Sequence, residues 1–355
     1  MAGKIRVLVV DDSILARKVI IDGLSRQPNI EVIGYAINAV DAKNKAIQLK
    51  PDVMTLDVNM PGQSGMDFLR SFLPEHPLPV VLVSSLNLGV FDAMHAGAVD
   101  FVRKPDAQQS NEMFISSLAQ KVTVASQAKV QRHSAASAAA NAANAPGAKI
   151  PLLGTSVAGR IIIGLGASTG GTEATLEVMK RLPADIPGMV ITQHMPTGFT
   201  KMYAERLNKL CAMEVREAKD GDEIKRGLAL IAPADLQMRV VRSPLGGYRV
   251  SCQPGEKVSG HRPSVDALFH SMAEQVRCPM VGIIMTGMGA DGAQGLLAMR
   301  KKGAYTIGQD KETSVVYGMP GVAHDIGAVM VQAACKDIAG VLIRRLRQGM
   351  SSAGQ

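Results

Sequence analysis

The sequence of 355 residues contains no tryptophan, and aromatic residues make up only 3% of it. Proteins that hold single-stranded nucleic acid stack its bases on aromatic side chains, so this scarcity argues against that class of function. Cysteine is scarce as well, and the four cysteines are far apart, with no C-x-x-C pair: Cys211, Cys252, Cys278 and Cys335. This pattern argues against a zinc site and against a disulfide framework, and it favours a reducing, cytoplasmic location.

Long hydrophobic runs are also missing. The longest candidate, residues 280–290, is about half of the roughly 20 apolar residues that a membrane-spanning helix needs. The apolar run at residues 7–10 ends at two aspartates and is too short for the core of a signal peptide. We therefore expect a soluble protein that is not exported and does not insert directly into a membrane.

Length and composition instead indicate two folded domains. A domain usually holds about 100–200 residues, and a hydrophobic content of 46% is ample for real cores. Basic residues exceed acidic ones by 8, a surplus that suits nucleic acid, an acidic membrane surface or an acidic protein partner. The surplus lies late in the chain, because residues 1–121 hold 12 basic and 13 acidic side chains and residues 159–355 hold 24 and 18.

The composition changes between residues 122 and 150, where 11 of 29 residues are alanine and none is aspartate or glutamate. We interpret residues 122–158 as a linker between domains at residues 1–121 and 159–348, followed by a tail at 349–355. Helical spacing continues from Asn111 into the linker, so we expect the last helix of the first domain to end near His133.

Short β-branched runs alternate with amphipathic stretches in the first domain. The predicted strands are residues 5–10, 30–36, 53–56, 80–83 and 99–102, and the predicted helices are residues 13–25, 40–49, 65–72, 89–95 and a last one from 111. This alternation predicts an α/β fold with a five-stranded, parallel, doubly wound sheet. In such sheets function gathers at the carboxyl ends of the strands.

Charged and hydroxyl side chains follow four of these strands. Asp11 and Asp12 follow the first, Asp57 the third, Ser84 the fourth and Lys104 the fifth. Three carboxylates at one edge would repel one another unless a cation bound them, and clustered oxygens suit Mg²⁺. Asp57 could then attack phosphorus and hold an aspartyl phosphate, to whose oxygens Ser84 would donate. Any one of these residues alone could be a helix cap or a surface charge, but the whole set favours a phosphorylation site.

Residues 4–121 resemble a response-regulator receiver domain. The resemblance implies that Asp57 is the phosphoacceptor, that Phe101 is the aromatic switch residue, and that Ser84 and Lys104 complete the pocket. It also implies that Mg²⁺ is bound for phosphorylation by Asp11, Asp12, Asp57 and the backbone of Asn59. One departure is that Ser64 stands where receivers usually carry an aspartate, which affects a turn and not the pocket.

The second half begins with a predicted strand that ends in Gly166-Ala-Ser-Thr-Gly170, followed by a helix predicted over residues 172–181. In a G-x-S-x-G pattern, the glycines let a serine, here Ser168, sit exposed on a tight strand-to-helix turn. The nearby helix N-terminus can stabilise an oxyanion. Dinucleotide binding is the rival interpretation, because Gly164, Gly166 and Gly170 also make a relaxed phosphate-binding turn.

The following strands favour the serine. The predicted strand 189–193 ends at His194, where a dinucleotide site would need an acidic or a basic side chain, and strand order places His194 at the same sheet edge as Ser168. A further predicted strand, 281–285, is followed by Asp291 before a helix over 293–301. Asp291 could cap that helix, or it could orient His194 as the base for Ser168. Other candidates remain open from the residues alone: the bases His270 and His324, and the acids Asp266 and Asp310.

Four motifs together resemble the chemotaxis protein-glutamate methylesterase family, CheB, over residues 1–121 and about 160–348: Gly166-Ala-Ser-Thr-Gly-Gly171, Gln193-His-Met-Pro196, His261-Arg-Pro-Ser-Val-Asp266 and Thr286-Gly-Met-Gly-Ala-Asp-Gly292. The resemblance implies that Ser168 is the nucleophile, His194 the general base and acid, and Asp291 the residue that orients His194. It further implies that Thr169 and Met288 shape the cleft and stabilise the oxyanion. His261 and Arg262 could either support the cleft or contact the substrate.

The resemblance also implies an α/β catalytic domain with a mainly parallel, doubly wound sheet, and a function. The expected activity is hydrolysis of γ-glutamyl methyl esters, and deamidation of glutamines, in methyl-accepting chemotaxis receptors, with no cofactor for the ester chemistry. Phosphorylation by the chemotaxis histidine kinase, CheA, is expected to free a cleft that the receiver domain covers. The basic second half then suits acidic receptor helices rather than nucleic acid. Two alternatives are a receiver-controlled DNA-binding regulator, although no helix-turn-helix pattern is present, and a receiver fused to an NADP-dependent oxidoreductase.

Overall fold

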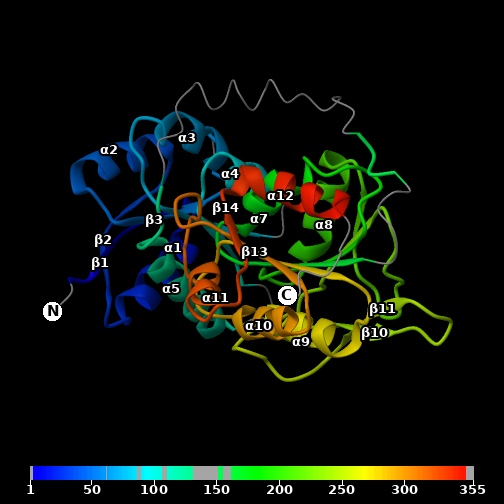
Figure 1. Ribbon diagram of the computed structural model, residues 1–355. Helices are drawn as coiled ribbons and strands as arrows, with labels where there is room; N and C mark the ends of the chain where they lie inside the picture. Colours follow the sequence, from blue (N-terminus) through cyan, green and yellow to red (C-terminus); the bar gives the residue numbers. More distant parts are fainter. Residues whose placement is uncertain are drawn as a thin grey trace. The chain divides into compact units, whose positions relative to one another are not determined.

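The chain folds as two α/β units that divide between residues 145 and 146. The structure, a computed structural model, describes residues 3–60, 62–85, 89–105, 110–130, 151–154 and 161–348 (Figure 1). The predicted tail at 349–355 and most of the predicted linker lie outside these residues. No helix in the described ranges is both long enough and apolar enough to cross a membrane.

The first unit is built on a parallel sheet of five strands in the order β2-β1-β3-β4-β5. Helices α1 and α5 contact each other, and α3 contacts both α2 and α4, as in a doubly wound fold. β3 and β4 are buried along their whole length, as their apolar, β-branched sequences predict. The elements are β1 (Ile5–Val10), α1 (Ile14–Ser25), β2 (Ile30–Ala36), α2 (Ala39–Leu49), β3 (Val53–Asp57), α3 (Gly65–Phe72), β4 (Val80–Ser84), α4 (Gly89–His95), β5 (Asp100–Arg103) and α5 (Asn111–Ala125).

Helix α5 ends at Ala125, eight residues before the end predicted from helical spacing. Val122, Val124 and Ala125 are its last buried side chains, and Gln127 and Lys129 beyond them are exposed. Most helical stability in a protein comes from packing of an apolar face, so spacing alone does not extend the helix past its last contacts. His133, the predicted end, lies outside the described residues.

The unusual Ser64 has a clear local role. Its hydroxyl accepts a hydrogen bond from the Asp67 backbone N–H at 3.2 Å and donates one to the Asp67 carboxylate at 2.7 Å. Ser64 is therefore the N-cap of α3, a position at which serine and aspartate serve equally well. The departure from the usual receiver sequence changes the start of one helix.

The second unit has a parallel sheet of seven strands in the order β14-β13-β12-β6-β7-β9-β8 and a separate antiparallel pair, β10 and β11. Helices α7, α8 and α12 gather on one side of the large sheet, and α9, α10 and α11 lie on the other (Figure 1). The elements are β6 (Ile162–Ala167), α7 (Gly171–Met179), β7 (Gly188–Gln193), α8 (Phe199–Leu210), β8 (Glu214–Glu217), β9 (Leu228–Ile231), β10 (Gln237–Arg242), β11 (Tyr248–Gln253), α9 (Val265–Gln275), β12 (Met280–Ile284), α10 (Ala293–Lys301), β13 (Tyr305–Gln309), α11 (Met319–Asp325), β14 (Val331–Ala333) and α12 (Cys335–Arg347).

The order of the central strands creates one place suited to a site. The chain passes from β6 to β7 on one side of β6, whereas β12 pairs with β6 on the other side. Ligand sites in open α/β sheets lie at such a switch point, outside the carboxyl ends of the strands. The segments that follow β6, β7 and β12 meet there.

Residues 151–154, at the end of the predicted linker, pack against the second unit. The backbone N–H groups of Leu153 and Gly154 each donate to the Asp185 carboxylate at 2.9 Å. The Arg226 guanidinium donates to the Gly154 carbonyl at 2.6 Å and to Asp185 at 2.7 Å. The side chain of Leu153 is buried. We call these four residues and their two partners the linker anchor.

Candidate active site

Ser168 lies on the tight turn between β6 and α7. Its backbone N–H donates to the Thr286 carbonyl at 2.9 Å, and its own carbonyl accepts from the Gly171 N–H at 2.7 Å. Gly170, at the helix N-cap, has a φ of +75°, and a Cβ atom there would lie 2.6 Å from Val315 Cγ2. Only glycine fits this position, so the G-x-S-x-G spacing reflects a real constraint on the backbone.

His194 directly follows β7 and is adjacent to the serine turn. Ala167 and Gln193, the last paired residues of β6 and β7, immediately precede Ser168 and His194. The His194 N–H donates to the Ala167 carbonyl at 3.1 Å. The buried Gln193 amide donates to the carbonyls of Ser168, at 2.9 Å, and His194, at 3.1 Å. The sequence did not single out Gln193, whose side chain holds the two segments together.

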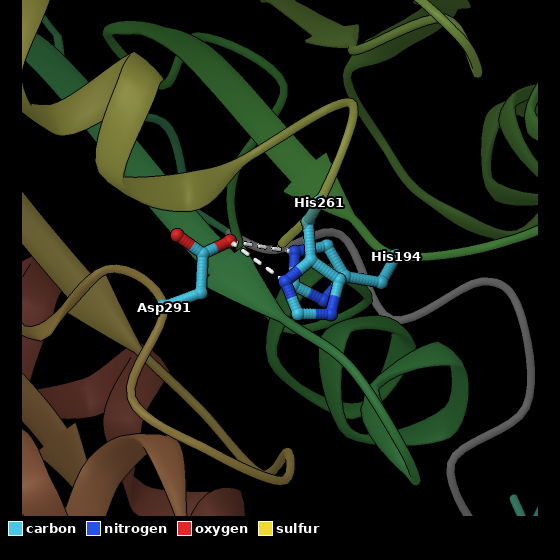
Figure 2. Close-up of side chains that lie close together, drawn as sticks. All are labelled: His194, His261 and Asp291. Carbon is cyan, nitrogen blue, oxygen red and sulfur yellow. Dashed lines mark hydrogen bonds and ion pairs between the residues drawn. The ribbon is translucent and has the colours of Figure 1, made fainter. Parts of the chain in front are cut away.

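Asp291 is the partner of His194. Its Oδ2 lies 2.8 Å from His194 Nε2 (Figure 2). The carboxylate also accepts hydrogen bonds from Ser264 Oγ at 2.7 Å and from the backbone N–H groups of Val265 at 2.8 Å and Asp266 at 2.9 Å. Burial raises the pKa of the Asp291 carboxyl, but the hydrogen bonds from His194, Asp266 and Ser264 outweigh burial and hold this pKa below its usual value.

Asp291 caps a helix, but not the one that follows it in the chain. The N-cap of α10 is Gly292, which has no side chain, and the Gly295 N–H in the first turn of α10 donates to the Asp266 carboxylate. The Asp291 carboxylate instead accepts hydrogen bonds from the first N–H groups of α9. The N-terminus of a helix is a favourable place for an anion. Ser264, the N-cap of α9, accepts from the Ala267 N–H while donating to Asp291. The sequence signal for Ser264 is a serine directly before the apolar residues that begin α9, a pattern typical of a helix N-cap.

The hydrogen bond to Asp291 assigns the two nitrogens of the His194 ring. An ionised carboxylate only accepts hydrogen bonds, so Nε2 carries a proton, and in the neutral ring the lone pair is then on Nδ1. Nδ1 is buried and has no hydrogen-bond partner among the described residues. It is therefore the nitrogen that can act as a base. No hydrogen bond joins Ser168 Oγ to any described residue, and in ligand-free enzymes such bonds often form only with substrate.

His261 lies face to face with His194, with ring centroids 3.9 Å apart and ring planes 7° apart (Figure 2). Its Nδ1 lies 2.8 Å from the Ser259 carbonyl and 3.9 Å from Asp291 Oδ2. The neighbouring Arg262 donates to the Gly255 carbonyl at 2.8 Å. Both residues of the motif therefore make contacts that support the loop around the site.

Ligand atoms of His194, His261 and Asp291 all lie within 4.8 Å of one another, so a metal site must be considered. A metal ion binds an imidazole nitrogen along its lone pair, in the plane of the ring, at about 2.0–2.1 Å. An ion close to both of two parallel, stacked rings would lie far outside both planes. The arrangement suits a hydrogen-bonded histidine and aspartate, and it does not fit metal coordination.

Thr169 and Met288 lie on either side of the serine turn. Thr169 is buried, and its carbonyl accepts from Thr286 Oγ1 at 3.0 Å. Gly287 lies directly against Ser168, because a Cβ atom on Gly287 would be 2.7 Å from Ser168 Cβ. The next residue, Met288, is 38% exposed, and its backbone N–H has no partner within the described part of the chain. That N–H group is available to an oxyanion.

The side chains of the rival bases and acids make other contacts or are exposed. His270 and His324 are exposed on α9 and α11. The Asp266 carboxylate accepts from Ser259 Oγ and the Gly295 N–H, and the Asp310 carboxylate accepts from Thr313. Within the described ranges, none of these four side chains bonds to Ser168 or His194.

The first unit has its own polar site at the carboxyl ends of β1, β3, β4 and β5. Lys104 Nζ lies 2.6 Å from Asp57 Oδ2 and 2.8 Å from Asp11 Oδ2, and the Asn59 N–H donates to Asp57 at 3.1 Å. Burial raises the pKa of the Asp57 carboxyl, although Lys104 lowers it in part. Burial lowers the pKa of Lys104, but its bonds to Asp11 and Asp57 outweigh burial and raise it.

The same pocket fits a magnesium ion. Asp11, Asp12 and Asp57 each offer a carboxylate oxygen, and these oxygens lie within 4.8 Å of one another, which is the donor type that Mg²⁺ prefers. Ser84 is fully buried, and its hydroxyl has no hydrogen-bond partner among the described residues. Phe101 is buried on β5 and packs edge to face on Phe91, with ring centroids 6.0 Å apart.

Comparison with known proteins decides the family. The model of the CheB methylesterase family matches residues 163–342, and that of the response regulator receiver domain matches residues 7–114. A protein-glutamate methylesterase/protein-glutamine glutaminase 2 of Syntrophomonas wolfei is 49% identical, over 97% of this chain and 98% of its own length. The chain belongs to the CheB methylesterase family. A relative of Salmonella choleraesuis, named protein-glutamate methylesterase/protein-glutamine glutaminase, is 40% identical over 98% of this chain and 99% of its own length.

Solved structures agree with this membership. The crystal structure of the Thermotoga maritima CheB methylesterase catalytic domain matches with a TM-score of 0.51 and 34% identity, and the match covers 53% of this chain and 98% of that one. The fold class expected from the sequence is confirmed, as is the resemblance to the CheB family. The comparisons support neither a DNA-binding output domain nor an NADP-dependent oxidoreductase.

Proposed function

We propose that this chain hydrolyses γ-glutamyl methyl esters, and deamidates glutamine side chains, in methyl-accepting chemotaxis receptors. One observation carries the catalytic assignment: Asp291 holds the proton of His194 on Nε2 and leaves the lone pair on Nδ1, and the His194 backbone N–H bonds to Ala167, the residue before Ser168. A base that is oriented by a carboxylate and adjacent to a serine is the arrangement that activates a hydroxyl nucleophile.

In the proposed reaction, Ser168 Oγ attacks the ester carbonyl carbon while His194 Nδ1 takes the hydroxyl proton. The negative charge that develops on the carbonyl oxygen is stabilised by the Met288 N–H and by the N-terminal end of α7 near Thr169. His194 then gives its proton to the methoxy oxygen, and methanol leaves an acyl-enzyme. Water attacks the acyl group with the same base, and the glutamate carboxylate and free Ser168 result. With glutamine, the proton from His194 goes to nitrogen and ammonia leaves.

The Asp291 carboxylate has a defined part in both steps. It stays ionised because its pKa is depressed, so it stabilises the charged imidazolium that forms when Nδ1 takes the proton. Asp291 also restricts His194 to the tautomer with a free Nδ1. The proton moves between Ser168, His194 and the leaving group in the first step, and between water, His194 and Ser168 in the second.

We propose that the first unit controls this reaction as a phosphoacceptor. Asp57 is the nucleophile toward a phosphoryl group supplied by the chemotaxis histidine kinase CheA, Ser84 donates to the new phosphoryl oxygens, and Lys104 balances their charge. Asp11, Asp12, Asp57 and the backbone of Asn59 would hold Mg²⁺, which supplies positive charge to the phosphoryl oxygens. A new dianion at Asp57 would shift a two-state equilibrium between covered and open forms of the cleft. The receptor regions that carry these glutamates face the cytoplasm, where the proposal places this chain.

The test is methanol release from methylated receptor membranes, with and without acetyl phosphate. Ser168→Ala is expected to lower kcat by about 10³-fold or more and to leave the fold intact by circular dichroism, because the step that forms the acyl-enzyme is lost. Ser243→Ala, in the turn between β10 and β11, is the matched control and is expected to keep wild-type activity. Substantial methanol release by Ser168→Ala would place the nucleophile elsewhere.

A further inference from the structure

The stacked histidine, His261, has no step of its own in the proposed reaction, although it covers one face of the base. Its ring lies 3.9 Å from the His194 ring and within 7° of parallel. The His194 side chain is only 9% exposed and the His261 side chain is 33% exposed, so His261 is the outer ring of the pair. Figure 2 shows the two rings face to face, with Asp291 at their edge.

His261 is itself held by a rigid loop. The Val258 N–H donates to the His261 carbonyl at 3.1 Å, and the His261 N–H donates to the Val258 carbonyl at 2.9 Å. Gln237, which is 1% exposed, donates to the same His261 carbonyl at 3.0 Å. The ring adds a contact between its Nδ1 and the Ser259 carbonyl at 2.8 Å. The backbone that carries the His261 ring is therefore held in place.

The contact with Ser259 also shows what His261 does not do. A carbonyl oxygen only accepts, so Nδ1 of His261 carries a proton. This nitrogen lies 3.9 Å from Asp291 Oδ2, beyond hydrogen-bond distance, whereas His194 Nε2 lies 2.8 Å from the same oxygen. His261 therefore makes no hydrogen bond to the Asp291 carboxylate, and its contact with His194 is through the face of its ring.

His194 needs such a support because one hydrogen bond does not fix a ring plane. The bond to Asp291 holds Nε2, but the ring can still turn about this bond, and turning would change the direction in which Nδ1 points. A flat ring against one face removes this freedom. Side chains that act in catalysis are held this way, by neighbours whose own conformations are locked.

We propose that His261 is a positioning residue, which keeps the ring plane of His194 fixed so that Nδ1 points at the reacting group. The inference rests on the assignment of His194 as the general base. It also predicts a difference between the two reactions. Ammonia can leave only when the nitrogen has received a proton from His194, so deamidation depends more strongly on the direction of Nδ1 than release of methanol does.

The experiment compares His261→Ala, which removes the flat surface, with His261→Phe, which keeps a flat ring but loses the bond to Ser259. We expect His261→Ala to lower kcat for methanol release by about 10- to 100-fold with KM within about twofold of wild type, as for other misplaced catalytic groups. The loss in ammonia release should be about threefold larger still, and His261→Phe should stay within about threefold of wild type. His270→Ala, an exposed histidine on α9, is the matched control.

Three results would overturn the proposal. The first is a wild-type kcat in His261→Ala. The second is a loss of kcat/KM that comes from a higher KM, which would indicate substrate contact, and the third is an equal loss of kcat in His261→Phe and His261→Ala. If His261→Ala fails to fold, His261→Leu replaces it, because leucine fills the space without a flat ring and should lose kcat. Ser168→Ala separates this proposal from the proposed function. An active Ser168→Ala contradicts the catalytic assignment, whereas an inactive Ser168→Ala together with a fully active His261→Ala contradicts only the role of His261.

Discussion

The two units each place a buried aspartate beside the carboxyl ends of parallel strands, and the two carboxyl groups differ in one respect. Asp57 is 4% exposed and Asp291 is 2% exposed. The pKa of Asp57 is raised, mainly by burial, and the pKa of Asp291 is lowered in spite of burial. The two carboxyl groups are almost equally buried, yet their pKa values are shifted in opposite directions.

The difference lies in the hydrogen-bond donors around each carboxylate. Asp291 accepts from four groups, two of which are backbone N–H groups at the start of a helix. Among the described residues, the Asp57 carboxylate accepts from Lys104 and the Asn59 N–H, and Asp11 adds a second negative charge nearby. A carboxylate with all its lone pairs occupied suits the orienting role that we propose for Asp291. A carboxylate that is less well satisfied keeps an oxygen for attack on phosphorus, as we propose for Asp57.

Replacing Asp291 tests the orienting half of this comparison and has the largest expected effect. Asp291→Asn keeps the size of the side chain but places an NH₂ group among hydrogen-bond donors. It also removes the carboxylate that keeps the His194 proton on Nε2. We expect kcat for methanol release to fall by about 10³- to 10⁴-fold, as in other serine hydrolases with this change. Steady-state kinetics measures the loss, and Asp266→Asn is a useful comparison because its carboxylate bonds to neither histidine. Activity within tenfold of wild type would contradict the assigned role.

Replacing Asp57 tests the nucleophilic half. Asp57→Ala should remove all stimulation of methanol release by acetyl phosphate, because the oxygen that accepts the phosphoryl group is gone, and it should leave the unstimulated rate near that of wild type. The measurement is the ratio of rates with and without the phosphodonor. Asp22→Ala, an exposed aspartate on α1, should keep the full ratio. Stimulation that persists in Asp57→Ala would mean that phosphate acts at another residue.

The opposite directions of the two pKa shifts predict opposite effects of pH on stability. These effects are smaller than the two changes in activity described above. The lowered pKa of Asp291 adds stability above its unfolded value of 3.8, and this stability is lost as the pH falls through the folded pKa. The raised pKa of Asp57 acts in reverse, since the first unit loses stability as the pH rises from 3.8 through the folded pKa. At pH 7, Asp57→Asn should raise the melting temperature of its unit, and Asp291→Asn should lower that of the other, each by about 2–8 °C.

Calorimetry of the full chain at pH 7 and at pH 3.5 would measure both shifts, and the variants would assign each transition to its unit. Both differences from wild type should shrink at the lower pH, where the unfolded carboxyl groups are largely protonated. Shifts in the same direction at pH 7 would show that burial, and not the donor set, dominates in both places.

Much of the fold, and the edge of each sheet at which the site lies, could be predicted from the sequence. Strands of parallel sheets are apolar runs, and the residue after each run lies at the shared edge. Ser168, His194 and Asp57 were placed at strand ends in this way, and the structure has them there. The surroundings of Asp291 could not be, because they depend on α9 packing against the segment after β12, and no local pattern reports such a contact. The same holds for the Gln193 amide and the stacking of His261. The end of α5 was predicted too late because spacing continues past the last buried side chain.

The linker anchor has a practical consequence for dividing the protein into parts. A catalytic fragment cut at residue 159, the predicted start of the second domain, would lose the Leu153 and Gly154 N–H groups that help to hold the pKa of Asp185 below its usual value. It would also leave the buried site of Leu153 unfilled. A fragment that begins at Pro151 keeps the buried leucine and every one of these bonds. The second unit is therefore best prepared by removing residues 1–150 and retaining the last residues of the linker.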